Sequence, residues 1–125
     1  MAAKTVLVID DDSATVNLIK HHLEKKEYQV FSAPDGEAGL KLAWEIMPGL
    51  ILLDMNMPKK TGLEVYHEIM WKEDRKMFPV IVLTSRTEFE TLFKDMNVDG
   101  FIPKPIDFAR LTEEVDKIFS KKSPL

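Results

Sequence analysis

The stretch Leu50-Ile51-Leu52-Leu53-Asp54-Met55-Asn56-Met57-Pro58 leads from an apolar run through an aspartate into a proline-containing turn. Four apolar residues in a row, with no alternating polar positions, are typical of a strand buried on both faces, as in a parallel sheet. A carboxylate at the end of such a run is costly unless it faces water or a cation. We therefore expect Asp54 at the open end of a buried strand.

The composition indicates one compact domain. A chain of 125 residues can bury a core of its own without crosslinks. It has no cysteine, so disulfide frameworks and zinc–thiolate sites are excluded. The net charge of −4 argues against nucleic-acid binding by this domain, because phosphate contacts need a basic face. No apolar run reaches the roughly 18 residues of a membrane span and no signal-peptide pattern is present, so we expect a cytoplasmic location without membrane contact.

Five apolar segments alternate along the chain with five amphipathic ones. The expected strands are 6–9, 28–33, 50–54, 79–83 and 101–103, and the expected helices lie near 13–26, 36–47, 62–70, 89–96 and 108–118. This alternation predicts the α/β class, with an open, doubly wound parallel sheet covered by helices on both faces. The segment 28–33 is the more polar strand, so we expect it at an edge.

Polar residues follow four of these strands. In open parallel sheets the ligand site lies beyond the carboxyl ends of the strands. The residues expected there are Asp10-Asp11, Asp54, Thr84 and Lys104. Three acids, a hydroxyl and an amine from distant parts of the chain should therefore meet at one edge of the sheet.

These groups suit one kind of chemistry. Clustered carboxylates repel one another and favour a bound cation, and oxygen ligands without cysteine or histidine select a hard ion such as Mg²⁺. Lys104 can neutralise a phosphate group, and Thr84 can donate a hydrogen bond to it. Because an aspartate can act as the nucleophile in phosphoryl transfer, we predict that Asp54 is a phosphoryl acceptor.

Five separated motifs carry a resemblance to a known family. They are Asp10-Asp11, Asp54 with Met57-Pro58 and Gly62, Thr84-Ser85, Phe101, and Lys104-Pro105. With these motifs the chain resembles the receiver domain of a two-component response regulator, of the kind found in chemotaxis regulators. The resemblance implies a single receiver domain over residues 1–125. It also implies a three-layer, flavodoxin-like (βα)5 fold with strand order 2-1-3-4-5, an order for which a chemotaxis regulator is a known example.

The resemblance also implies roles for the acids. Asp54 would be the phosphoacceptor. Asp11 would ligate Mg²⁺ directly, together with Asp54 and the backbone carbonyl of Asn56. Asp10 would hold the ion largely through water. Asp12 fits a helix cap better than a metal ligand.

The remaining implied roles concern signalling. Lys104 would pair with the phosphoryl group, and the Lys104-Pro105 bond would be cis. Thr84 and Phe101 would form the switch pair, although Phe101 stands where the family often has tyrosine. A histidine kinase or phosphotransfer protein would be the donor. The face built by the fourth helix, fifth strand and fifth helix would then signal to a downstream protein or to an output domain missing from the chain.

Two other functions remain open from the sequence. Asp10-Asp11-Asp12 contains the Asp-x-Asp pattern of haloacid-dehalogenase-like phosphatases, in which Asp10 would be the nucleophile. The short chain argues against that enzyme. A binding module that keeps the fold without phosphorylation is the other alternative, and the intact acid set argues against it. We therefore expect a signalling domain that catalyses its own phosphoryl transfer and dephosphorylation, and no conventional enzyme.

Overall fold

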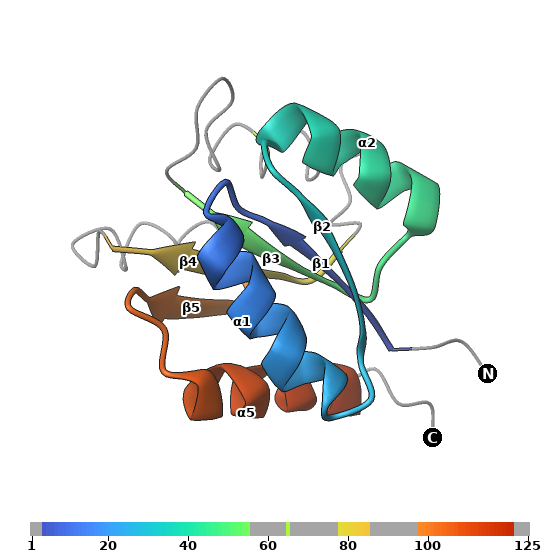
Figure 1. Cartoon of the computed structure of the whole chain (residues 1–125). Coiled ribbons are helices and arrows are strands. Elements are labelled where there is room, and N and C mark those ends of the chain that lie inside the picture. Colours follow the sequence, from blue (N-terminus) through green and yellow to red (C-terminus); the bar gives the residue numbers. More distant parts are fainter. Residues whose placement is uncertain (1–3, 56–64, 66–77, 86–97, 122–125) are drawn as a thin grey trace.

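Five parallel strands form the centre of the molecule. The computed structural model describes residues 4–55, 65, 78–85 and 98–121. In these residues the strands are β1 (Thr5–Ile9), β2 (Gln29–Ala33), β3 (Leu50–Asp54), β4 (Val80–Thr84) and β5 (Gly100–Pro103). They pair in the order β2-β1-β3-β4-β5, which confirms the predicted order and the predicted edge position of β2 (Figure 1).

Three of the five expected helices fall within the described residues. They are α1 (Ser13–Glu24), α2 (Gly36–Ile46) and α5 (Phe108–Lys121). The helices expected near 62–70 and 89–96 lie outside the described residues, apart from the helical position Val65. No described helix combines the length and apolar composition needed to cross a bilayer.

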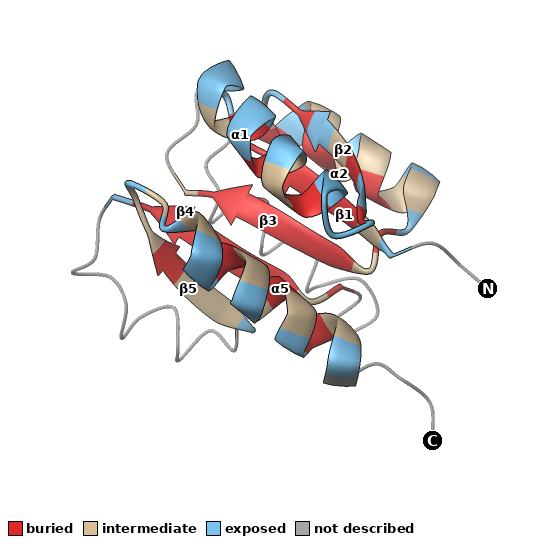
Figure 2. Ribbon diagram, turned by 60° about the horizontal axis from the view of Figure 1, so that its bottom comes forward, coloured by how far each residue is buried: buried red, intermediate tan, exposed pale blue. Residues whose placement is uncertain are grey.

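The sheet is buried on both faces. Along β1, Val6 and Val8 belong to a core cluster shared with α1 and α5, whereas Leu7 and Ile9 belong to a second cluster on the α2 side. All of β3 is buried, from Leu50 to Asp54 (Figure 2). The absence of polar alternation in this strand thus reflects apolar neighbours on both sides, and the result is a three-layer α/β fold.

Local side chains begin and end the helices. Asp12 caps α1 by accepting a hydrogen bond from the Ala14 N–H at 3.1 Å, which confirms its predicted role as a cap. Asp35 caps α2 in the same way, and α2 ends at Met47 in the left-handed conformation, with φ 48°. Helix α1 ends at Glu24, earlier than the expected Lys26, because the chain turns through Glu27 at φ 70°.

A close approach sets the distance between α2 and β1. A Cβ atom on Gly39 would lie 2.6 Å from Cδ1 of Ile9. Only glycine leaves room for this contact without a shift of the neighbouring side chain. Since Ile9 directly precedes Asp10, this contact helps to position the carboxyl end of β1.

At the opposite end of the sheet, a part-buried polar contact joins α5 to the turn before β2. The Tyr28 side chain is only 4% exposed, and its hydroxyl donates a short hydrogen bond to the Asp116 carboxylate. The Tyr28 ring also contacts Phe119, with 5.2 Å between ring centroids. Burial raises the pKa of Tyr28, and the hydrogen bond to Asp116 raises it further.

This contact predicts a pH dependence of stability above about pH 10, the ordinary pKa of tyrosine. The folded state holds the Tyr28 proton more tightly than the unfolded state, so the stabilisation is complete below that pH and is lost as pH rises. Urea unfolding of the wild type between pH 8 and 11 should show a fall of up to about 1.4 kcal/mol per pH unit that is absent in Tyr28→Phe. Parallel curves for the two proteins would contradict this prediction.

Candidate functional site

The backbone brings four strand ends together at the carboxyl edge of the sheet. The ladder pairs Ile9 with Leu53, Asp54 with Leu83, and Thr84 with Pro103. Three further hydrogen bonds extend it past the strand ends: Asp10 N–H to Ala33 O at 3.1 Å, Met55 N–H to Leu83 O at 3.1 Å, and Lys104 N–H to Thr84 O at 2.8 Å. The residues that follow the strands are therefore held in place by the sheet itself.

Three carboxylates meet at this edge, as the sequence predicts. One oxygen from each of Asp10, Asp11 and Asp54 lies within 4.8 Å of the others. Asp10 and Asp54 are 2% and 3% exposed, while Asp11 is exposed. Oxygen ligands at this spacing fit a small, hard divalent cation, so the donor set agrees with the predicted ion.

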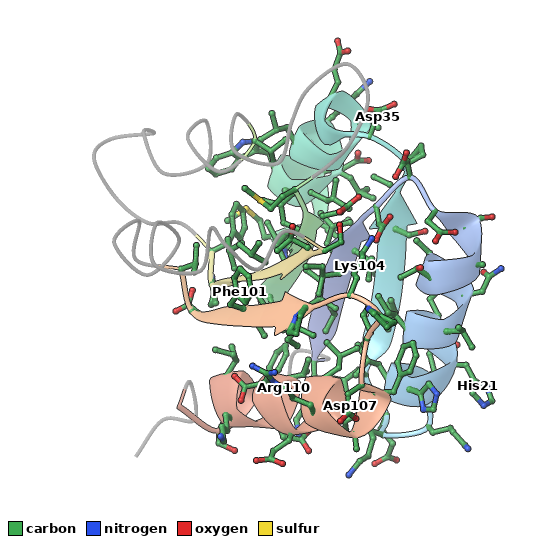
Figure 3. All side chains as sticks on the ribbon, turned by 90° about the vertical axis from the view of Figure 1, so that its left-hand side faces the viewer. His21, Asp35, Phe101, Lys104, Asp107 and Arg110 are labelled. Atoms are coloured by element: carbon green, nitrogen blue, oxygen red, sulfur yellow. The ribbon has the colours of Figure 1, made fainter. Side chains whose placement is uncertain are left out.

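The Lys104 ammonium lies among these acids. Its Nζ atom is 2.9 Å from Oδ2 of Asp10 and 3.4 Å from Oδ1 of Asp54. Partial burial lowers the pKa of Lys104, but the hydrogen bond to Asp10 and the charges of Asp54 and Asp10 outweigh it and raise the pKa. Lys104 is therefore a fixed positive charge at neutral pH, and Figure 3 shows it beyond the end of β5.

The acids differ in their protein partners. Both oxygens of Asp10 are engaged, because Oδ1 accepts a hydrogen bond from the Asp12 N–H at 2.9 Å and Oδ2 accepts from Lys104. Within the part of the chain that the structure describes, Asp11 makes no hydrogen bond or ion pair. Asp11 is thus the more available acid for direct contact with a ligand.

The two predicted switch residues lie on neighbouring strands. Thr84 is fully buried at the end of β4. Phe101 in β5 is half-buried against the core cluster on the α2 side (Figure 3). The Lys104-Pro105 peptide bond is cis, as predicted, whereas Asn56, the predicted carbonyl ligand, lies outside the described residues.

Two features of this region were missed from the sequence. Arg110 of α5 donates a hydrogen bond to the Phe101 carbonyl at 3.1 Å, so α5 is tied to the predicted switch strand. A pocket of about 450 Å³ lies beside Lys104, lined by Asp12, Thr15, Leu18, Ser85, Lys104, Pro105, Ile106 and Phe108. The residue that could have indicated this pocket from the sequence is Leu18, an apolar side chain that lies off the stripe formed by Val16, Ile19 and Leu23. In the structure Leu18 is 49% exposed.

Fold and site together define a flavodoxin-like domain with an acid cluster and a lysine at the carboxyl edge of its sheet. Residues 6–116 match the family model of the response regulator receiver domain. The chain therefore belongs to the response regulator receiver domain family. Such domains are parts of signalling proteins that take phosphoryl groups from histidine kinases, and they are not classical enzymes.

Known proteins similar to this chain include regulators and solved receiver structures. PhoP of Bacillus subtilis, the alkaline phosphatase synthesis transcriptional regulatory protein, is 33% identical over 94% of this chain and 49% of its own length. TrrA of Thermotoga maritima, solved in complex with Mg²⁺-BeF, is 31% identical with a TM-score of 0.82, over 92% of this chain and 98% of that one. Chemotaxis protein CheY4 of Vibrio cholerae is 28% identical with a TM-score of 0.84, over 94% of this chain and 99% of that one.

Proposed function

We propose that Asp54 accepts a phosphoryl group from the phosphohistidine of a histidine kinase or a phosphotransfer protein. The observation that carries this proposal is the position of Asp54, buried at the end of β3 beside two other acids and 3.4 Å from an ammonium group. A carboxylate held in this way is a positioned nucleophile. The negative charge that develops on the transferred phosphoryl group would lie near the Lys104 ammonium.

Mg²⁺ is the cation proposed for the acid cluster. Asp11, Asp54 and the Asn56 carbonyl would hold it directly, and Asp10 would hold it through water because both Asp10 oxygens already have protein partners. When bound, the ion neutralises negative charge on the phosphoryl oxygens. The similar protein TrrA was crystallised in complex with Mg²⁺-BeF, which supports this choice of ion.

The proposed roles of the other residues follow from their places. Lys104 would pair with the phosphoryl group, and Thr84 would donate a hydroxyl hydrogen bond to it from the end of the neighbouring strand. Phe101 would turn inward as Thr84 moves, and the Arg110 contact with the Phe101 carbonyl would pass the change to α5. The face that includes β5 and α5 would then change its affinity for a partner.

The chain spans about half the length of the curated relative PhoP. We propose that residues 1–125 form one receiver domain that acts in the cytoplasm. It would signal to a downstream protein or to an attached output domain. The net charge of −4 argues against nucleic-acid binding by this domain itself.

Mass spectrometry of the phosphorylated wild-type protein tests the assignment. The protein is incubated with Mg²⁺ and a small phosphodonor such as acetyl phosphate, the acyl phosphate is trapped, and the modified peptide is sequenced. We expect modification at Asp54. Modification at Asp10 would instead support the phosphatase alternative, which the family match and the engaged Asp10 oxygens argue against. No acyl phosphate at either aspartate would refute the proposed function.

A further inference from the structure

The edge strand β2 has one side without a strand partner. In the described sheet it pairs with β1 alone and lies at the end of the strand order (Figure 1). Residues 28–34 carry no charge, whereas proteins commonly protect such edges with charged side chains. We propose that β2 is an interaction surface for a second copy of this chain, which adds its own β2 in the antiparallel direction. This inference does not depend on the proposed function.

The backbone of β2 carries the hydrogen-bonding groups that such a pairing needs. The Gln29 N–H donates to the Lys4 carbonyl at 2.8 Å, so Gln29 and every second residue after it turn their backbone groups towards β1. The N–H and carbonyl groups of Val30 and Ser32 therefore point outwards. Within the residues that the structure describes, these outward groups make no hydrogen bond. Two donors and two acceptors are thus open along this edge.

The open groups are symmetric about Phe31. With a two-fold axis beside Phe31, Val30 of each copy would face Ser32 of the other, and the two residues would exchange both of their backbone hydrogen bonds. The two Phe31 side chains would form a non-hydrogen-bonded pair, in which opposite side chains approach most closely. Phe31 is half-buried against the core cluster on the α2 side, so the second copy would cover its exposed part.

An apolar strip on α2 continues this surface. Trp44 contacts Phe78, with 5.2 Å between ring centroids. Because Phe78 precedes β4, this contact marks the flank of α2 that faces away from β2. Leu42 and Ile46 are one turn apart on the opposite flank, and hence lie on the side of the β2 edge. Both are half-buried against the same cluster as Phe31, so the three side chains give the edge an apolar border.

The position of α2 along the strand sets which of its residues would meet the second copy. Gly39 lies against Ile9, and Ile9 pairs with Ala33, so Gly39 is level with Ala33. Phe31 lies about 7 Å further back along β2, and α2 covers that length in about four to five residues. Ala43 is therefore level with Phe31, and the two-fold axis would pass beside Ala43.

The charges on α2 fit this axis. An antiparallel arrangement about residue 43 brings Lys41 of one copy opposite Glu45 of the other, and the same pair recurs on the other side of the axis. Both side chains are exposed and form no ion pair within the described part of the chain. This self-complementary pattern of charge favours a second copy over an unrelated extended peptide as the occupant of the edge.

The arrangement leaves the proposed signalling groups free. β2 and β5 are the two ends of the strand order, so pairing through β2 does not cover the face that includes β5 and α5. Asp54 lies on β3, two strands away from β2. A pair formed in this way would present two acid clusters and two signalling faces in one assembly.

Sedimentation equilibrium of the whole chain over a wide concentration range tests the proposal, and we expect a reversible monomer–dimer equilibrium. Hydrogen exchange then locates the interface. The Val30 and Ser32 amides should exchange more slowly as the concentration rises, because dimerisation gives them acceptors. The Phe31 amide should not change, because it already faces β1.

A charge swap on α2 tests the two-fold axis. Lys41→Glu turns two attractive pairs into repulsive ones and should raise the dissociation constant of the dimer by about fivefold or more. The double variant Lys41→Glu/Glu45→Lys restores opposite charges and should return to within about twofold of the wild type. Lys117→Glu makes the same charge change at an exposed position of α5 and is the matched control, which should dimerise like the wild type.

Several results would overturn the inference. One is a monomer at every concentration, which would leave the edge to a different partner. A dimer in which the Val30 and Ser32 amides exchange as fast as in the monomer would have its interface elsewhere. Assemblies that grow beyond two copies would contradict a closed two-fold pair, and failure of the double variant to recover would contradict the axis at residue 43. The labelling of Asp54 is measured separately and can succeed or fail without changing these outcomes.

Discussion

Asp54→Asn is expected to lower phosphoryl incorporation from a small phosphodonor by roughly a thousandfold or more, a loss typical of removing a nucleophile. The amide nitrogen cannot attack phosphorus, and the side chain keeps its size, so the buried end of β3 should remain folded. Asp10 is a poor substitute, because both of its oxygens are held by the Asp12 N–H and by Lys104. Incorporation is measured by intact-mass spectrometry at a fixed time and Mg²⁺ concentration.

A matched variant separates loss of the nucleophile from loss of charge. Asp35 is the cap of α2 and accepts a hydrogen bond from the Ala38 N–H at 2.8 Å. Asparagine caps helices about as well as aspartate, so Asp35→Asn should label at the wild-type rate. If Asp54→Asn still labels at a rate near that of Asp35→Asn, Asp54 is not the acceptor.

Asp10→Asn gives a further distinction within the cluster. In the proposed function Asp10 acts on the ion through water, so this variant should slow labelling while Asp54 remains the modified residue. In the phosphatase alternative Asp10 is the nucleophile, and the same variant should abolish labelling. The two models thus differ in which substitution removes the acyl phosphate.

Strand positions were predictable because they depend on local apolar patterns. The continuous run before Asp54 predicted a doubly buried strand, and β3 occupies Leu50–Asp54 with every residue buried. The parallel topology then placed Asp10, Asp11 and Asp54 at one edge before any distance was known. A short continuous apolar run is therefore sufficient to predict a buried strand, and the parallel topology then predicts which groups meet at its end.

Side-chain partners were less predictable because they depend on tertiary distances. The closer pairing of Lys104 with Asp10 than with Asp54 reflects a difference of half an ångström between 2.9 and 3.4 Å, which residue types alone do not determine. The Arg110 contact with the Phe101 carbonyl depends on how α5 lies against β5. Boundaries such as the end of α1 at Glu24 depend on one left-handed residue, Glu27.

Leu52→Ala is expected to cost about 2–5 kcal/mol in the free energy of unfolding, the usual range for a leucine removed from a packed core. Leu52 has no exposed surface. It lies in β3 between Val8 of β1 and Ile81 of β4, in the core cluster that α1 and α5 cover. Neighbours held in a sheet on both sides relax little, so the substitution should leave most of the cavity open.

The same substitution at an exposed site supplies the control for Leu52→Ala. Leu18 in α1 is 49% exposed, and Leu18→Ala should change stability by no more than about 0.5 kcal/mol. Urea unfolding of the three proteins at equal pH measures both effects, and similar losses for the two variants would contradict the buried position of β3. Since domains of this size are stable by only about 5–15 kcal/mol, Leu52→Ala should reduce the folded fraction near physiological temperature. The Asp54 labelling rate per folded molecule should be retained, because Leu52 packs the core two residues before the acceptor without contributing to its charge.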